Sequence, residues 1–157
     1  MAAFVSLGLW GDLRGFVGPQ ACGVICGERL IGGVVYHDWT PDAGLIELSA
    51  YFERHDWLTR DKLRAILAYP FDIAGCRMAV ARYAEHNNTA RRIWKAWGAR
   101  ETRIPDLHAP GVALCVATLS ADDWRGSRFM RGSSVTPNLA TANVRDSRLM
   151  DAVSGGN

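Results

Sequence analysis

The sequence has no long hydrophobic run. Among its 157 residues no stretch approaches 18 uninterrupted apolar positions, which excludes a membrane-spanning helix of ordinary length. The segment from Met1 to Gly18 carries Asp12 and Arg14 inside its apolar stretch and has no basic flank, so it makes a poor signal peptide. We therefore expect a cytoplasmic protein without a membrane partner.

Cysteine is also scarce, with four residues in the chain. Cys22 and Cys26 lie four positions apart in an alternating, strand-like pattern, which separates them by about 13 Å along one face. Cys76 and Cys115 lie in apolar runs that also indicate strands. We interpret all four as small buried hydrophobic residues in a reducing compartment, with a metal site as the alternative, and we predict no metal.

The chain has almost no excess of charge of either sign, because its formal net charge is only +2. Residues 1–124 hold 13 basic and 14 acidic side chains, whereas residues 125–157 hold five arginines against Asp146 and Asp151. A balanced body of this kind is not expected to bind the phosphate backbone of a nucleic acid. Only the last 33 residues are mildly basic.

What is present indicates one globular domain, since 48% of residues are hydrophobic and 22% are charged. Hydrophobic periodicity, caps and turn residues predict a short helix or apolar arm before residue 20 and then a series of strands and helices. The expected series is a hairpin at 22–38 turning at 27–29, a strand at 45–52, a helix from Thr59 to Pro70, a strand at 76–83, a helix from Asn87 or Asn88 to Gly98, and strands at 101–104 and 111–119. This order predicts an α/β (α+β) fold with a mixed sheet flanked by helices.

The pattern changes after Trp124, where Ser, Gly, Asn and Arg become frequent. We therefore divide the chain into a domain at 1–124 and a basic, irregular arm at 125–157. One interpretation of the arm is a disordered tail. The other is a segment that orders on a protein partner, with apolar anchors at Phe129, Met130, Leu149 and Met150.

The run Asn87-Asn-Thr-Ala-Arg-Arg-Ile-Trp-Lys-Ala-Trp-Gly98-Ala99 resembles the N-x-x-A-x-x-x-Y-x-x-x-G-F signature of the GCN5-related N-acetyltransferases, the GNAT superfamily. Asn87, Ala90 and Gly98 fall at the family's spacing. The block from Arg54 to Leu63 lies where that family carries its acyl-CoA loop. The resemblance covers about residues 20–120. Within the family, the sequence is similar to a divergent branch found in phage and prophage genomes. It implies a mixed, mostly antiparallel sheet that is truncated at the N-terminus.

The resemblance also implies acetyl-CoA as cosubstrate, with its pantetheine chain between splayed strands at 45–52 and 76–84. Backbone N–H groups at a strand-to-helix turn form a cradle for pyrophosphate, and arginines beside them can bind phosphate. Surface arginines and a plain cap at Asn87 are the structural alternatives. The implied cofactor-binding residues are Tyr51, Phe52, Arg54, Trp57, Leu58, Thr59, Arg60 and Asn87.

An N-acyltransferase needs a base that takes a proton from the incoming ammonium. Glu47 is the first candidate, because it lies in the middle of a strand, on a face shared with Leu45, Ser49 and Tyr51. The alternative is a carboxylate at the rim, paired with an arginine such as Arg82. His37, near the end of the hairpin, is the second candidate.

Two departures from the family pattern support a second hypothesis. Trp94 stands where the family's tyrosine protonates the leaving thiolate, and an indole N–H is no acid near neutral pH. Trp57 and Thr59 replace the glycines of the acyl-CoA loop. The alternative function is a catalytically inactive binding or structural protein of this fold, possibly phage-encoded, that docks through its C-terminal arm. No signal in the sequence identifies the acceptor amine, whether small molecule or protein.

Overall fold

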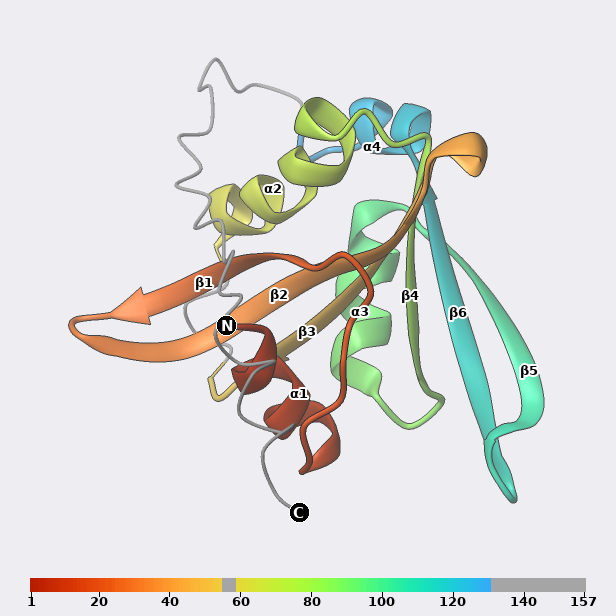
Figure 1. Cartoon of the computed structure of the whole chain (residues 1–157). Coiled ribbons are helices and arrows are strands. Elements are labelled where there is room, and N and C mark those ends of the chain that lie inside the picture. The colour runs from red at the N-terminus through yellow and green to blue at the C-terminus, as the bar shows by residue number, and fades with distance from the viewer. Residues whose placement is uncertain (55–58, 131–157) are drawn as a thin grey trace.

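The computed structural model describes residues 1–54 and 59–130, and it contains one six-stranded sheet in the order β1-β2-β3-β4-β6-β5 (Figure 1). The strands are β1 (Gln20–Cys26), β2 (Arg29–Thr40), β3 (Leu45–Phe52), β4 (Met78–Ala84), β5 (Arg100–Ala109) and β6 (Val112–Ser120). The helical segments are α1 (Ala2–Trp10), η1 (Pro41–Ala43), α2 (Arg60–Ala68), η2 (Tyr69–Ile73), α3 (Asn88–Trp97) and α4 (Ala121–Gly126). All neighbouring strands are antiparallel except β3 and β4, so the predicted mixed sheet is confirmed.

The parallel junction between β3 and β4 is short. It pairs Leu45–Glu47 with Met78–Val80, and in the described part of the chain the two strands have no paired positions after Glu47 and Val80. From there their carboxyl-terminal halves separate. The predicted splaying of these two strands is therefore confirmed, and Glu47 lies at the point where they part.

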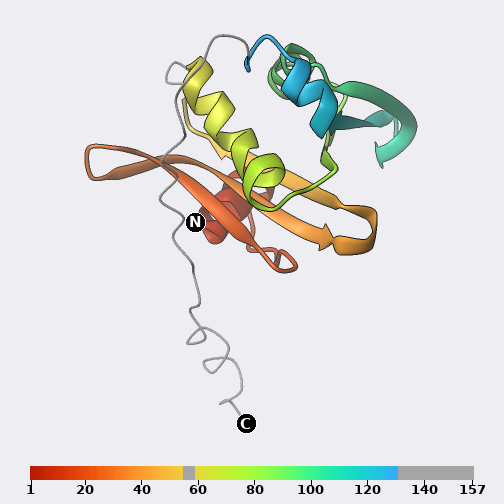
Figure 2. The ribbon, with the colours of Figure 1, turned by 90° about the horizontal axis from the view of Figure 1, so that it is seen from above.

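Helices cover both faces of the sheet (Figure 2). α1 packs on the face that carries Tyr51, where the Phe4 ring meets the Tyr51 ring edge to face. The approach is close enough that a Cβ at Gly8 would lie 2.2 Å from the Tyr51 ring, so only glycine fits there. Of the two alternatives expected before residue 20, a short helix or an apolar arm, the structure contains the helix. Within residues 1–54 and 59–130, no helix has the length and apolar character needed to cross a membrane.

The main core lies on the opposite face, under α2, α3 and α4. Tyr36 from β2 is 1% exposed, and its hydroxyl donates a 2.7 Å hydrogen bond to the carbonyl of Ile66 in α2. That carbonyl needs an outside donor, because Pro70, four residues later, has no backbone N–H. The proline was expected to end the helix. The α-helix does end at Ala68, and η2 continues as one π-helical turn to Ile73.

The ends of α3 follow the sequence prediction. The Asn87 side chain accepts a 3.0 Å hydrogen bond from the Ala90 N–H, which caps the amino end. Gly98 ends the helix in the left-handed conformation with φ of 96°. Trp94 and Trp97 project from one side of this helix into the core and pack edge to face at 5.2 Å between ring centroids.

The cysteines are all free thiols, but only part of their expected burial is confirmed. Cys76 and Cys115 are buried, and burial raises the pKa of the Cys76 thiol to about 11. Cys22 is half-buried, and Cys26 is exposed at the end of the edge strand β1, so the prediction was wrong for Cys26. Cys26 is exposed because it is the last residue of the strand, beside the turn, where the alternation of side chains no longer determines burial.

The segment just after Trp124 belongs to the core. Phe129 is 7% exposed and stacks on Trp124 with ring centroids 6.3 Å apart, and Met130 packs against the same cluster. Phe129, which one interpretation made an apolar anchor for a partner, packs in the core of its own chain, and docking of the arm on a partner stays a prediction. The domain boundary at 124 stays a prediction, and Leu149 and Met150 lie outside the described residues.

Candidate functional site

Polar side chains gather where β3 and β4 part. His37 on β2 pairs across the sheet with Glu47 on β3, and Glu47 in turn lies opposite Val80 on β4. Because side chains alternate along a strand, Glu47 and Ser49 project to the same face as α1. The two predicted catalytic residues, Glu47 and His37, are thus brought together at the parallel junction.

Glu47 is held by an arginine. The Arg82 guanidinium, from the half of β4 that is not paired with β3, donates a 2.7 Å hydrogen bond to the Glu47 carboxylate. The Glu47 side chain is 13% exposed, and the hydrogen bond to this carboxylate raises the pKa of Arg82. Sequence analysis left this pairing open as the alternative to a base, and the structure contains it. The ion pair crosses the line along which the two strands separate, so it connects both sides of the gap.

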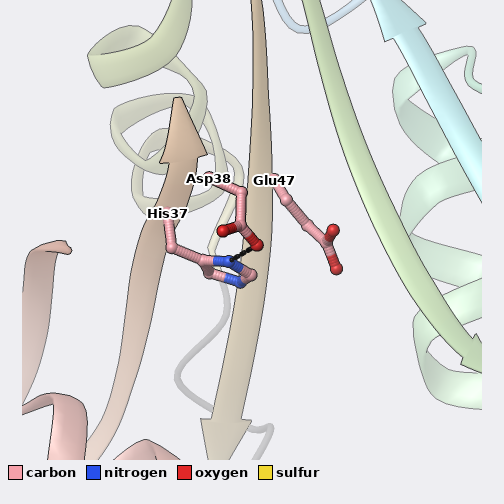
Figure 3. Close-up of side chains that lie close together, drawn as sticks. All are labelled: His37, Asp38 and Glu47. Carbon is pink, nitrogen blue, oxygen red and sulfur yellow. Dashed lines mark hydrogen bonds and ion pairs between the residues drawn. The ribbon is translucent and has the colours of Figure 1, made fainter. Parts of the chain in front are cut away.

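His37 has partners at both ring nitrogens. The ring is 5% exposed; Nδ1 lies 2.8 Å from a carboxylate oxygen of Asp38 and Nε2 lies 2.9 Å from the Ser49 hydroxyl. The Phe16 ring covers it, with centroids 4.8 Å apart. Figure 3 shows Asp38 directed onto His37, while Glu47 lies on the adjacent strand. The imidazole is therefore fixed in orientation and largely shielded from water.

Sequence reasoning missed Asp38. Strict alternation directs its side chain to the face opposite His37, but the register between β2 and β3 breaks between His37 and Thr40. Asp38 has φ of 51°, in the left-handed region that few residues other than glycine adopt. This irregularity turns its carboxylate to the His37 side of the sheet. Strained backbone of this kind is often found at functional sites.

The cluster could also be considered as a cation site. One ligand atom each from His37, Asp38 and Glu47 lies within 4.8 Å of the others. Both ring nitrogens of the histidine and the carboxylate of Glu47 already have hydrogen-bond partners, however, and Arg82 brings a positive charge to the same place. The arrangement therefore favours proton transfer over metal binding.

The cofactor-binding residues predicted on β3 lie beyond the cluster. Tyr51 projects under α1, against Phe4, and Phe52 is half-buried against the main core. Arg54 follows the strand and is exposed. Trp57 and Leu58 lie outside the described residues.

The remaining predicted residues lie at helix amino ends. Thr59 caps α2 by accepting a hydrogen bond from the Lys62 N–H at 3.4 Å. Arg60, the first residue of α2, is exposed and donates a hydrogen bond to the carbonyl of Arg128. Asn87 is occupied as the cap of α3, through its carbonyl oxygen. The amino end of α2 thus presents its first N–H groups beside a cation, the combination that favours an anion.

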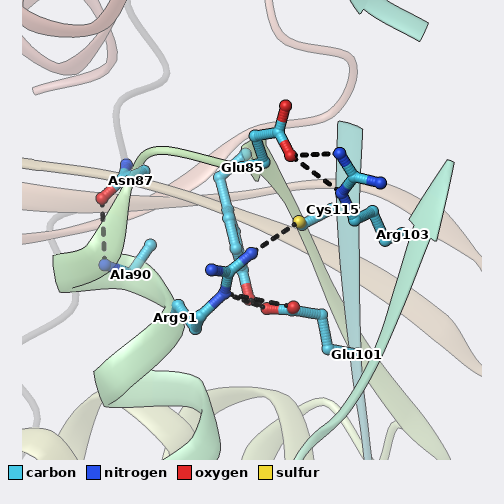
Figure 4. Close-up of polar contacts among 8 residues, drawn as sticks. Glu85, Asn87, Ala90, Arg91, Glu101, Arg103 and Cys115 are labelled. Atoms are coloured by element: carbon cyan, nitrogen blue, oxygen red, sulfur yellow. Dashed lines mark hydrogen bonds and ion pairs between the residues drawn. The ribbon is translucent and has the colours of Figure 1, made fainter. Parts of the chain in front are cut away.

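A second polar network joins α3 to β4 and the outer strands (Figure 4). The Glu101 carboxylate accepts hydrogen bonds from the Tyr83 hydroxyl at 2.8 Å and from Arg91 at 3.1 Å, and Arg91 also donates to the Cys115 thiol. Burial opposes the charge of Glu101, yet these hydrogen bonds hold its pKa below its usual value. Burial first, and then the bond to Glu101, raises the pKa of Tyr83. Since every partner is a group of the chain itself, this network fastens α3 to the sheet.

Glu85 has a comparable role at the end of β4. Its carboxylate accepts the Ala113 N–H at 3.0 Å and pairs with Arg103, and these contacts lower its pKa. Through these two contacts, Glu85 joins the end of β4 to the outer hairpin formed by β5 and β6.

No protein-family model matches the sequence, and no curated protein matches it. Solved structures are similar in fold. A mutant form of the spermidine N-acetyltransferase SpeG from Vibrio cholerae aligns with a TM-score of 0.59 and 14% identity over 68% of this chain and 68% of that chain. A probable acetyltransferase aligns at 0.56 with 17% identity, over 65% and 61% of the two chains. A putative acetyltransferase aligns at 0.56 with 19% identity, over 76% and 63%.

This chain spans 61% to 68% of the length of these three structures. At these identities the likeness shows the fold alone: a mixed, mostly antiparallel six-stranded sheet with helices, as in GNAT acetyltransferases. It is similar to enzymes described as N-acetyltransferases, and the phage-type branch stays a prediction.

Proposed function

We propose that this protein is an acyl-CoA-dependent N-acyltransferase that transfers an acetyl group from acetyl-CoA to an amine. The observation that carries the proposal is the position of the polar cluster. Glu47, His37 and Arg82 lie where the only parallel strand pair in the described part of the chain opens. A gap between two strands, with an acid–base group at its closed end, suits a linear thioester and an attacking amine.

The residues near this gap fit the cosubstrate. After Glu47, β3 is no longer paired with β4 in the described residues, so the backbone near Tyr51 can bind a pantetheine amide or a developing oxyanion, with Phe52 beside it. The amino end of α2 with Thr59 and Arg60 suits a pyrophosphate. Asn87 would contribute through its side-chain amide nitrogen, because the oxygen caps α3.

The chemistry follows from these positions. The acceptor enters as an ammonium and loses its proton to the Glu47 carboxylate, which Arg82 keeps in place. The neutral amine attacks the thioester carbonyl, the C–S bond breaks, and the proton that the new amide nitrogen loses passes through water to the CoA thiolate. Trp94 does not act in this step, because an indole does not release its proton near neutral pH.

A thermal-shift titration with acetyl-CoA tests the proposal. A ligand at a hundred times its dissociation constant stabilises the fold by about 2.7 kcal/mol, which for a chain of this size raises Tm by roughly 5–10 °C. Arg60→Gln should weaken the response, whereas Arg100→Gln, an exposed change on the distant strand β5, should leave it unchanged. Acetylation of an amine panel, followed by release of free thiol, then reports transfer.

A second candidate is a non-catalytic binding protein of the same fold, and the Glu47–Arg82 ion pair is the observation that favours it. A carboxylate that is neutralised by an arginine can serve to join two strands and nothing more. In this case millimolar acetyl-CoA produces no thermal shift. A partner would then bind through another surface, including the arm at 125–157, and a phage origin belongs to this hypothesis.

A further inference from the structure

The Glu47–Arg82 ion pair uses only part of each charged group. Oε1 of Glu47 accepts the 2.7 Å hydrogen bond, and the nitrogen that donates it is Arg82 Nε. Within residues 1–54 and 59–130, the second oxygen of Glu47 and the two terminal nitrogens of Arg82 make no hydrogen bond. A guanidinium carries its other N–H donors on those two nitrogens, and a carboxylate accepts at both oxygens. The pair therefore presents an available acceptor beside available donors.

The cation is the more exposed member of this pair. The Arg82 side chain is 55% exposed, whereas the Glu47 side chain is 13% exposed. Glu47 lies at the last paired position between β3 and β4, and Arg82 lies two residues beyond it on β4. Figure 3 shows the Glu47 carboxylate directed away from His37, toward β4. A molecule that enters from solvent at the junction thus meets the guanidinium before it reaches the carboxylate.

Asp38 completes the charges at the junction. Its carboxylate lies 2.8 Å from His37 Nδ1. The hydrogen bond to Glu47, together with the charges of Glu47 and Asp38, raises the pKa of Arg82, so both carboxylates act on this guanidinium. With a neutral imidazole, two carboxylates and one guanidinium leave a net negative charge. A simple anion is repelled by this surrounding, and a molecule that also carries an ammonium is not.

We infer that the acceptor amine is an amino acid with a free carboxylate, and that Arg82 is the residue that selects it. This inference rests on the proposed function for the identity of the acetyl donor. The ammonium of the acceptor donates to the second oxygen of Glu47, and its carboxylate accepts from the terminal nitrogens of Arg82. Because these two groups are neighbours in one ion pair, only a short carbon link fits between the amine and the carboxylate.

Both charges of such an acceptor find an opposite partner while the Glu47–Arg82 contact is kept. The ammonium loses its proton to Glu47, the amine attacks the thioester directly, and the product is the N-acetyl amino acid. An amine without a carboxylate gains nothing from the terminal nitrogens of Arg82. A hydrogen bond to a charged group has a net value that corresponds to a preference on the order of 10- to 100-fold.

Steady-state transfer from acetyl-CoA to matched acceptors tests the inference. The common L-amino acids and β-alanine are each compared with two analogues, the carboxamide and the amine that lacks the carboxyl group. The analogues keep the reacting nitrogen and the side chain but carry no negative charge. For the amino acids that the protein accepts, kcat/KM should exceed that of both analogues by about 10- to 100-fold.

Arg82→Gln separates recognition from chemistry. The variant should abolish the preference for the free acid, because the ratio of two acceptors in one variant cancels any effect on Glu47. The KM for acetyl-CoA should stay near its wild-type value, and Arg82→Lys, which keeps the charge without the planar fork, should restore part of the preference. Arg29→Gln is the matched control, since Arg29 is an exposed arginine that is ion-paired with Glu53 outside the junction. It should leave the preference unchanged.

Thermal shifts with the amino acids alone separate this inference from the proposed function. An amino acid that raises Tm of the wild type but not of Arg82→Gln, in a protein without a response to acetyl-CoA, would keep the acceptor and reject the donor. Equal transfer to acids and analogues, or a preference that survives in Arg82→Gln, would overturn the inference and keep the donor. Neither binding nor acetylation of any amino acid by the folded wild-type chain would also overturn it. Melting curves establish that each variant is folded.

Discussion

Replacing Tyr36 by phenylalanine should destabilise the protein without disturbing its packing. The substitution removes one hydroxyl, which is buried and donates to the Ile66 carbonyl at 2.7 Å. Pro70 cannot replace this donor, so the carbonyl becomes a buried acceptor without its partner. An unsatisfied buried group costs about 1–3 kcal/mol. For a chain of this length a loss of about 2 kcal/mol lowers Tm by roughly 4–8 °C.

Tyr69→Phe is the matched control. The Tyr69 ring packs on Tyr36 with centroids 4.6 Å apart, but within the described residues its hydroxyl makes no hydrogen bond, and it is half-buried. Differential scanning calorimetry of both variants beside the wild type should therefore show a loss for Tyr36→Phe alone. Equal melting temperatures for the two variants would refute the argument that the phenol replaces a missing helical donor. The contact also fixes α2 on β2, so Tyr36→Phe should weaken any ligand held at the α2 amino end.

Three further outcomes are expected. Glu47→Gln should lower kcat by about 10²–10⁴-fold in a steady-state assay while the KM for acetyl-CoA stays near its wild-type value; unchanged kcat would remove Glu47 from the mechanism. The lowered pKa of Glu101 stabilises the fold above the unfolded value of 4.5, and this contribution disappears as the pH falls through the lower folded value. Denaturant unfolding should thus find Glu101→Gln less stable than wild type at pH 7, with a gap that closes toward pH 3, whereas a constant gap contradicts the charge argument. A chain ending after Trp124 loses Phe129 from the core and should be less stable by about 3–5 kcal/mol. A chain ending after Met130 retains this ring and serves as the control. Equal melting temperatures of the two chains would show that the ring contributes nothing.

Local signals predicted much of the fold. The alternation at 45–52 corresponds to β3 with the same bounds, and Thr59, Asn87 and Gly98 occupy the caps that their side chains and conformational freedom favour. These features depend on interactions within a few residues, and so the sequence carries them. The outer strand β5 was expected only at 101–104 and extends from Arg100 to Ala109, where the register with β6 breaks after Ile104 and pairing resumes at Ala109.

The candidate site was predictable only in part, since its contacts join distant positions. Glu47 stands out as a carboxylate on an otherwise uncharged strand face, but its partner Arg82 lies 35 residues away. Asp38 gives no signal, because the alternation of β2 assigns it to the wrong face and only the irregular register reverses that. Ser49 gives no signal either, because its contact with His37 depends on the pairing of β2 with β3.

The short β3–β4 junction divides the sheet into two antiparallel triplets of strands. Residues 20–52 supply β1, β2 and β3, and residues 78–120 supply β4, β5 and β6, so each antiparallel triplet is contiguous in the chain. Each triplet can close its own loops early, and only three rungs then remain to be formed between them. We expect amide hydrogen exchange to resolve two cooperative blocks, with the backbone of β3 after Glu47 exchanging first along the opened edge.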